Sequence, residues 1–149
     1  MVQALLKHPD WRFASILVEK CKVNPTIQDQ AAFYPKFASM VLRFVFKGRV
    51  RVGTNQVLIY TDTLPVANQR RAVEASIKKA CHADLGPIPF CVFHHPRGSN
   101  AWLQVVDYCS WAVFRRWEKK DDRTYVQLRP RLADTELDIT ARGDGTTYY

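Results

Sequence analysis

Two short apolar runs separated by one long helical pattern limit the possible folds of this chain more than any other sequence feature does. The run VLIYTD, residues 57–62, and the run IPFCVFHH, residues 88–95, are rich in β-branched and aromatic residues and predict strands. Between them Pro65 opens a helical pattern that continues to residue 84. Its inward positions are Val73, Ile77 and Ala80. Consecutive strands joined by a helix pair in parallel through a right-handed crossover, so the chain is predicted to be an α/β protein.

Further elements extend the alternation on both sides. The run RFASILVEK, residues 12–20, predicts a strand of about eight residues. Residues 30–47 predict a helix, because Phe33, Phe37, Met40, Val41 and Phe44 recur at spacings of three and four. A last long helix is expected from a Ser99 or Asn100 cap to about Lys119. After residue 123 Pro130 excludes one unbroken helix, and residues 141–149 are expected to form a flexible tail.

Composition fits one domain over residues 1–149, since 47% of the 149 residues are hydrophobic and no internal linker interrupts them. Lys and Arg number 22 against 14 Asp and Glu, a net charge of +8 that favours polyanionic partners. No apolar run reaches the roughly 18 residues of a membrane helix, so no membrane partner is expected. We expect a cytoplasmic location and four reduced, mostly buried cysteines, because they form no CxxC pair.

The last helix carries a carboxylate among apolar residues. Its first turns are apolar on almost every side, which predicts a mostly buried helix. Asn100, Gln104 and Asp107 fall on one stripe that Trp111 continues. Because an ionised group in an apolar setting loses its hydration, Asp107 is expected to have a partner. An arginine, a neighbouring helix end and a cation are the alternatives.

Asp62 closes the run VLIYTD and is therefore expected at the carboxyl end of a strand, where ligands of open α/β sheets gather. The run itself predicts a strand buried on both faces. If Asp62 and Asp107 meet there, their repulsion is relieved by a divalent cation such as Mg²⁺, which prefers oxygen ligands. The alternative for Asp62 is a polar residue of a strand-end turn.

Several runs resemble one known family. LQVVDY, preceded by HHPRGSN and followed by FRRWEKKDDRTY, resembles the C-terminal part of the domain of unknown function 3800 family, whose members are similar to ribonuclease H in fold. VLIYTD and the earlier strand leading into VEK also match the family's order of elements. The resemblance covers roughly residues 11–128. Family members open with a strand bearing aspartate, glutamate and serine, and this chain has no such motif before its first strand, which implies a partial member truncated at the N-terminus.

The resemblance implies a metal-dependent nuclease or phosphodiesterase with Mg²⁺ or Mn²⁺ as cofactor. Asp62 matches the middle-strand acid and Asp107 the last-helix acid, and paired metals held by such acids cleave phosphodiesters. His95 is the candidate for proton transfer. Asn100 and Gln104 are implied to orient substrate or water, and Arg115 and Glu118 to border the site. Asp10 is a poor substitute for the missing first acid.

Two other hypotheses compete with the metal-dependent nuclease, and a homodimer is compatible with each of them. Cys81, His82, Cys91, His94 and His95 include zinc-ligand types, but Cys91 and His94 would point to opposite faces of a strand. A catalytically inactive remnant would instead be a nucleic-acid-binding or protein-interaction module, with a basic patch of Arg43, Lys47, Arg49 and Arg51. In that module Trp102, Tyr108, Trp111 or Trp117 would stack on bases where exposed. An unpaired sheet edge would also let a second copy pair there, which leaves a homodimer open.

Overall fold

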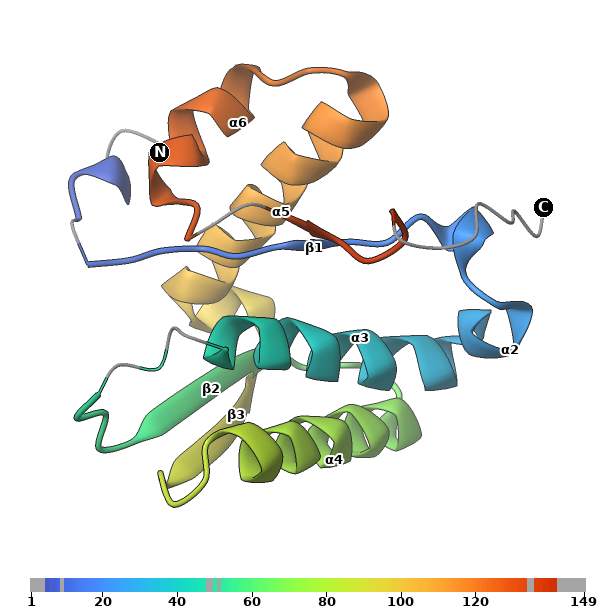
Figure 1. Cartoon of the computed structure of the whole chain (residues 1–149), viewed down its shortest axis with the longest axis vertical. Helices are drawn as coiled ribbons and strands as arrows, with labels where there is room; N and C mark the ends of the chain where they lie inside the picture. The colour runs from blue at the N-terminus through green and yellow to red at the C-terminus, as the bar shows by residue number, and fades with distance from the viewer. Residues whose placement is uncertain (1–4, 9, 48–49, 51, 134–135, 142–149) are drawn as a thin grey trace.

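The computed structural model describes residues 5–8, 10–47, 50, 52–133 and 136–141, and it is an α/β protein (Figure 1). Its helices and strands in chain order are β1 (Ile16–Leu17), α2 (Pro25–Gln28), α3 (Gln30–Phe46), β2 (Val57–Asp62), α4 (Ala67–Asp84), β3 (Phe90–His95), α5 (Ala101–Lys119), α6 (Arg123–Leu128) and β4 (Leu137–Asp138). Short 3₁₀ turns lie at η1 (Lys20–Lys22), η2 (Arg97–Ser99) and η3 (Arg129–Arg131).

The central unit is the pair of parallel strands β2 and β3 joined through α4. Val57 pairs with Phe90 and Asp62 with His95, so the two strands are in register along their whole length. The sequence prediction of both strands, of the helix between them and of their parallel pairing is confirmed. Gly86 has φ +59, a left-handed conformation that favours glycine, and it turns the chain between α4 and β3.

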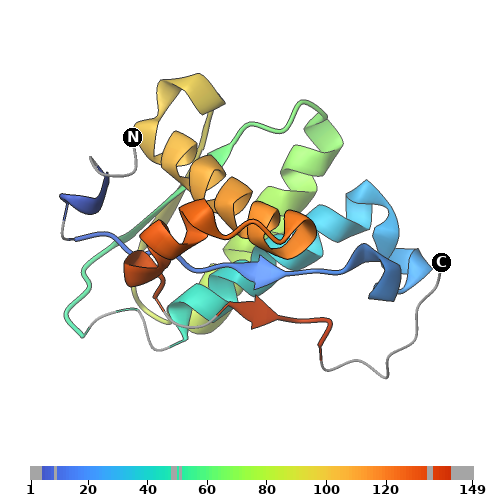
Figure 2. The same cartoon turned by 90° about the horizontal axis from the view of Figure 1, so that it is seen from above.

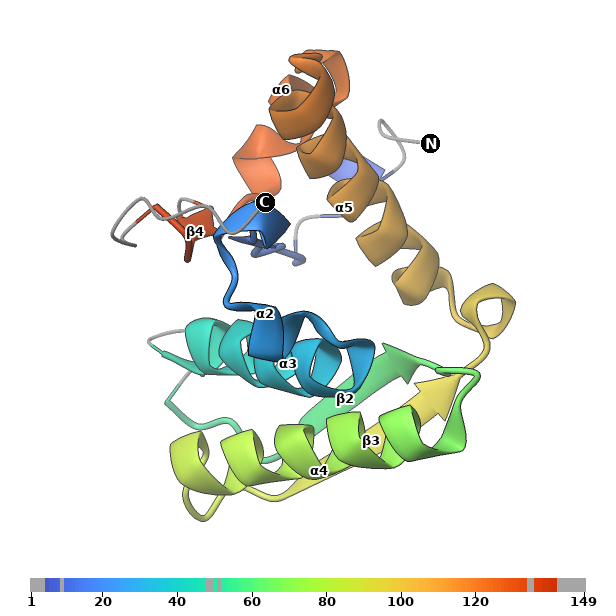
Figure 3. The same cartoon turned by 90° about the vertical axis from the view of Figure 1, so that its right-hand side faces the viewer.

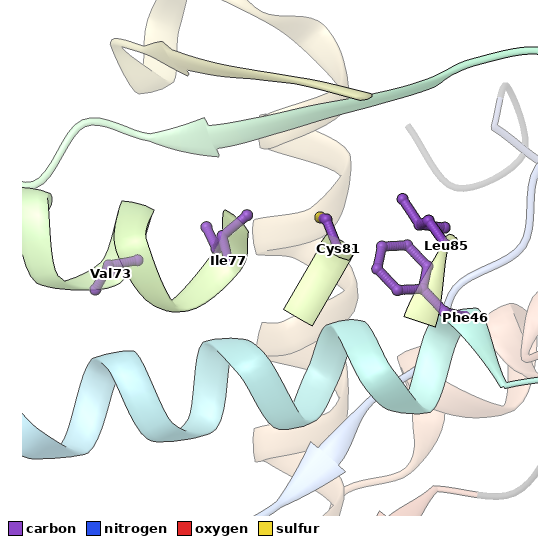
Figure 4. Close-up of a cluster of buried hydrophobic side chains, with 5 residues drawn as sticks. All are labelled: Phe46, Val73, Ile77, Cys81 and Leu85. Carbon is purple, nitrogen blue, oxygen red and sulfur yellow. The ribbon is translucent and has the colours of Figure 1, made fainter. Parts of the chain in front are cut away.

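One face of this sheet is covered by the helices α3 and α4. Val73, Ile77 and Cys81 recur every four residues along α4 and form a buried cluster with Phe46 of α3 and with Leu85 (Figure 4). The inward residues of the strands pack on this cluster, namely Val57, Ile59, Phe90 and Val92. Ser76 also donates a hydrogen bond of 2.6 Å to the carbonyl of Pro35, which ties α4 to α3.

The other face of the sheet is open to solvent, so the prediction of a strand buried on both faces is wrong. Leu58, Tyr60 and Phe93 are 49%, 43% and 39% exposed. In the run VLIYTD, Val57 and Ile59 are apolar because they pack on the helices. On the other face Tyr60 stacks on Phe93, with ring centroids 5.1 Å apart.

A second hydrophobic cluster joins the N-terminal segment to α5 and α6. Trp11 packs there with Cys109, Ala112 and Leu128. Beside this cluster β1 pairs in parallel with β4, and Figure 2 shows the two strands side by side. The strand predicted over residues 12–20 is reduced to Ile16–Leu17 and one bridge from Phe13, since its partner β4 is itself only two residues long.

The ends of the other predicted helices and of the predicted tail can be compared with the structure. The helices predicted over residues 30–47 and up to Lys119 are confirmed. Ala141 is described and its N–H binds the Asp138 carboxylate at 3.0 Å, whereas residues 142–149 of the expected tail lie outside the described residues. Within the described ranges, no helix is both long enough and apolar enough to cross a lipid bilayer.

Candidate functional site

Asp62 is the last residue of β2 and stands beside His95, the last residue of β3. Side chains alternate along a strand, so both belong to the face that carries Tyr60 and Phe93. The rings of Tyr60 and His95 are 5.5 Å apart, in agreement with this assignment. Asp62 is partly buried at the carboxyl edge of two parallel strands, the edge at which α/β sheets bind ligands.

The two adjacent histidines of β3 point in different directions. His95 lies toward the loop that follows, where its Nδ1 is 3.4 Å from the hydroxyl of Ser99. His94 lies on the helix side, with its Nδ1 2.7 Å from the Thr61 hydroxyl and its Nε2 3.4 Å from the carboxylate of Glu74. Of the two histidines, His95 therefore shares a face with Asp62.

The sequence alone did not reveal the series of side-chain contacts that positions His94. Glu74 on α4 also binds Lys78 at 2.6 Å, and the Lys78 hydrogen bond lowers the pKa of the Glu74 carboxyl, with His94 adding to the effect. Helical spacing of four predicts the Glu74–Lys78 pair, but only the strand register places Thr61 next to His94.

The helix α5 begins at the same edge of the sheet. Asn100 caps it, and its side-chain oxygen accepts a hydrogen bond of 2.9 Å from the N–H of Trp102, as the sequence predicts. The turn η2 connects β3 directly to this cap (Figure 3). Residues of α5 contact residues of β2. Asp107 follows the cap by seven residues, about 10 Å along the helix axis.

Asp107 is exposed, and so is Gln104, which contradicts the prediction that the first turns of α5 are mostly buried. The buried residues of the helix are confined to one side of it, at Leu103, Cys109, Ala112 and Val113. That side is covered by the N-terminal segment and α6, and the other side faces solvent. Because the Asp107 carboxylate is exposed, it keeps its hydration, and burial is not a reason to expect a partner for it.

Arg115 and Glu118 lie farther along α5. The Arg115 guanidinium binds the Asp121 carboxylate at 2.5 Å and lies over the Trp111 ring, 5.7 Å from its centroid. Hydrogen bonds from Arg123 and Arg115 hold the pKa of Asp121 well below its usual range. Glu118 is exposed. The structure therefore ties Arg115 to the loop after α5, two turns beyond Asp107.

The predicted basic patch is described only in part. Arg43 is exposed and its Nε lies 3.2 Å from the Asp84 carboxylate, so part of its charge is balanced by an acid. Lys47 is exposed at the end of α3. Arg49 and Arg51 lie outside the described residues.

In the part of the chain that the structure describes, the candidate ligands do not form a complete metal site. No group of three or more His, Cys, Asp or Glu there is placed to hold one ion. The zinc set is accordingly dispersed: Cys81 is buried in the α3–α4 cluster and Cys91 is exposed on the opposite face of the sheet from His94. Asp62 and Asp107 each carry the carboxylate oxygens that Mg²⁺ prefers, and the elements that bear them, β2 and α5, are in contact.

A cleft of about 380 Å³ opens beside Asp62. Its exposed lining is almost wholly apolar, and the residues of polar type that border it are Thr61, Asp62, Arg70 and His94. Its remaining walls are apolar and come mainly from α3, α4 and the β1 region, including Tyr34 and Phe37. The expectation that the stripe of Phe33, Phe37, Met40, Val41 and Phe44 faces the core is wrong. The α3 residues in or against the core cluster are Ala38, Leu42, Val45 and Phe46, whereas Phe37 and Val41 border the cleft.

Comparison of this chain with protein-family models, with curated proteins and with solved structures found no match in any of the three.

Proposed function

We propose that the chain hydrolyses phosphodiester bonds of nucleic acid at a divalent cation, Mg²⁺ or Mn²⁺, bound by Asp62 and Asp107. The observation that carries this proposal is that β2, which ends in Asp62, contacts the helix α5 on which Asp107 is exposed. When bound, such a cation polarises the phosphodiester and activates a water molecule. Two carboxylates are the usual protein share of a Mg²⁺ site that a substrate phosphate completes.

Neighbouring residues supply the remaining groups of the proposed site. His95 has its Nδ1 toward Ser99, so we assign its Nε2 the role of accepting a proton from water. The oxygen of the Asn100 amide is used by the helix cap, which leaves its NH₂ group to orient substrate. Gln104 is exposed one turn before Asp107 and would contact the same phosphate.

The type of α/β fold is part of the same proposal. We propose a ribonuclease H-like arrangement, supported by the parallel β2–α4–β3 unit followed by a helix that carries an acid. We also propose a cytoplasmic location, because Cys21, Cys81, Cys91 and Cys109 are all free thiols.

The proposal is tested by cleavage of end-labelled oligonucleotides with Mg²⁺ in wild type, Asp62→Asn and Asp107→Asn. Each substitution removes a cation ligand worth several kcal/mol, so we expect a rate loss of at least about a hundredfold. Asp122→Asn, which changes another exposed acid, is the matched control and should cleave like the wild type. Equal, metal-independent rates in all four proteins would refute the assignment.

A second candidate function is nucleic-acid binding without cleavage. It is favoured by the net charge of +8 and by the exposed Trp102, Trp111 and Trp117 of α5. In this case the wild type would bind nucleic acid with an affinity that falls steeply with salt, while no cleavage would be detected with Mg²⁺ or Mn²⁺.

A further inference from the structure

Three of the four tryptophans of the chain lie exposed on α5. Trp102, Trp111 and Trp117 are 54%, 47% and 45% exposed, and Phe114 on the same helix is 54% exposed. The remaining tryptophan, Trp11, is buried. Single exposed apolar side chains are ordinary, but this concentration of aromatic rings on one helix indicates a binding surface.

The rings closest to Asp107 form an ordered platform. Trp111 and Phe114 follow Asp107 by four and seven residues, so all three lie on one stripe of α5, about 6 and 10 Å apart along its axis. The Trp111 ring stacks on Tyr108, with centroids 5.7 Å apart and planes inclined by 29°. We call Tyr108, Trp111 and Phe114 the Trp111 platform.

The charge of the whole chain and the cations at the end of α5 favour a polyanion over a neutral partner, although the platform itself is flanked by Asp107 and Glu118. The chain carries a net charge of +8, and the C-terminal end of α5 leads into the exposed cations Lys119 and Lys120. The guanidinium of Arg115, which is paired with Asp121, lies 5.7 Å from the centroid of the Trp111 ring. Aromatic rings interspersed with cations are the means by which proteins bind single-stranded nucleic acid, since every base presents a π-face.

We propose that the substrate is single-stranded nucleic acid, with bases stacked on the Trp111 platform and a backbone phosphate beside Asp107. This inference rests on the proposed function, because it takes the carboxylate of Asp107 as part of the reactive site. A duplex is the poorer substrate, because its bases stack on each other and withhold their faces from Trp111. The platform thereby selects the form of nucleic acid, while Asp62 and Asp107 act on its backbone.

The test is fluorescence anisotropy with a labelled single strand and with a duplex of equal phosphate number, both in EDTA so that cleavage is absent. We expect the single strand to bind at least about tenfold tighter, and Trp111→Ala to weaken its binding by about tenfold, the value of one base–aromatic stack. Trp111→Phe keeps an aromatic face and should retain most of the affinity. Val126→Ala, which alters an exposed residue of α6, is the matched control and should bind like the wild type.

Three outcomes would overturn the inference. Equal binding of strand and duplex would do so, as would unchanged affinity in Trp111→Ala with a native circular dichroism spectrum. A concentration-dependent dimer that Trp111→Ala dissociates would show that a second copy covers the surface. Failure of the proposed function is distinguishable, because Asp62→Asn would then cleave like the wild type while binding still depended on Trp111.

Discussion

At the scale of single residues, Asp107 shows what a helical pattern establishes and what it omits. The spacing of Asn100, Gln104, Asp107 and Trp111 predicts one stripe of α5, and the helix Ala101–Lys119 places them on it. The pattern does not reveal how much of the helix is covered, because Trp102 and Val106 read as core residues and yet are exposed. Burial depends on which distant segments pack on the helix, and these are Trp11 and Leu128.

Asp121 allows a residue-scale prediction about stability and pH. Arg123 and Arg115 lower the pKa of the folded Asp121 carboxyl from its ordinary 3.8, so its ionised form stabilises the folded state. That contribution is complete above the ordinary pKa and declines as the pH falls below it. We therefore expect Asp121→Asn to unfold at lower denaturant concentration than the wild type at about pH 7, with a smaller difference at about pH 3. A difference that grows on acidification would contradict the assignment.

At the scale of elements, local periodicity predicted the long helices and strands, but for the short strand β1 it predicted residues 12–20 where the strand is Ile16–Leu17. The elements α3, α4, α5, β2 and β3 follow from repeats within their own sequence. The pairing of β1 with β4 joins Ile16 to Leu137 over two residues, and no local pattern records it. The covering of only one face of β2 escaped prediction for the same reason, because it depends on where α3 and α4 pack.

The packing of α4 gives an element-scale prediction. Ile77 is 2% exposed at the centre of the cluster between α3, α4 and the strands. Ile77→Ala should therefore reduce the free energy of unfolding by about 2–5 kcal/mol, measured by urea denaturation. Lys79→Ala, at an exposed position of the same helix, should change it by no more than about 0.5 kcal/mol. Similar effects of the two substitutions would show that α4 packs through a different face.

At the scale of the whole molecule, the two proposed cation ligands belong to different groups of elements. Asp62 belongs to the unit of α3, β2, α4 and β3, whose cluster is centred on Ile77 and Cys81. Asp107 belongs to α5, which packs through Cys109 and Ala112 on the N-terminal segment and α6. The sequence predicted that Asp62 ends a strand and that Asp107 lies on a helix, but the distance between the two carboxylates depends on how these groups join. A ribonuclease H-like fold stays a proposal for a related reason, since each described sheet has two strands.

The most direct test of the shared cation is a titration with Mn²⁺ followed by electron paramagnetic resonance, with a cleavage-resistant phosphorothioate single strand present. If Asp62 and Asp107 hold one ion, each single Asn substitution will abolish the high-affinity Mn²⁺ site, and the double variant will lose no more than either single one. Asp122→Asn should bind Mn²⁺ like the wild type. Undiminished Mn²⁺ binding in Asp62→Asn or in Asp107→Asn would contradict the account.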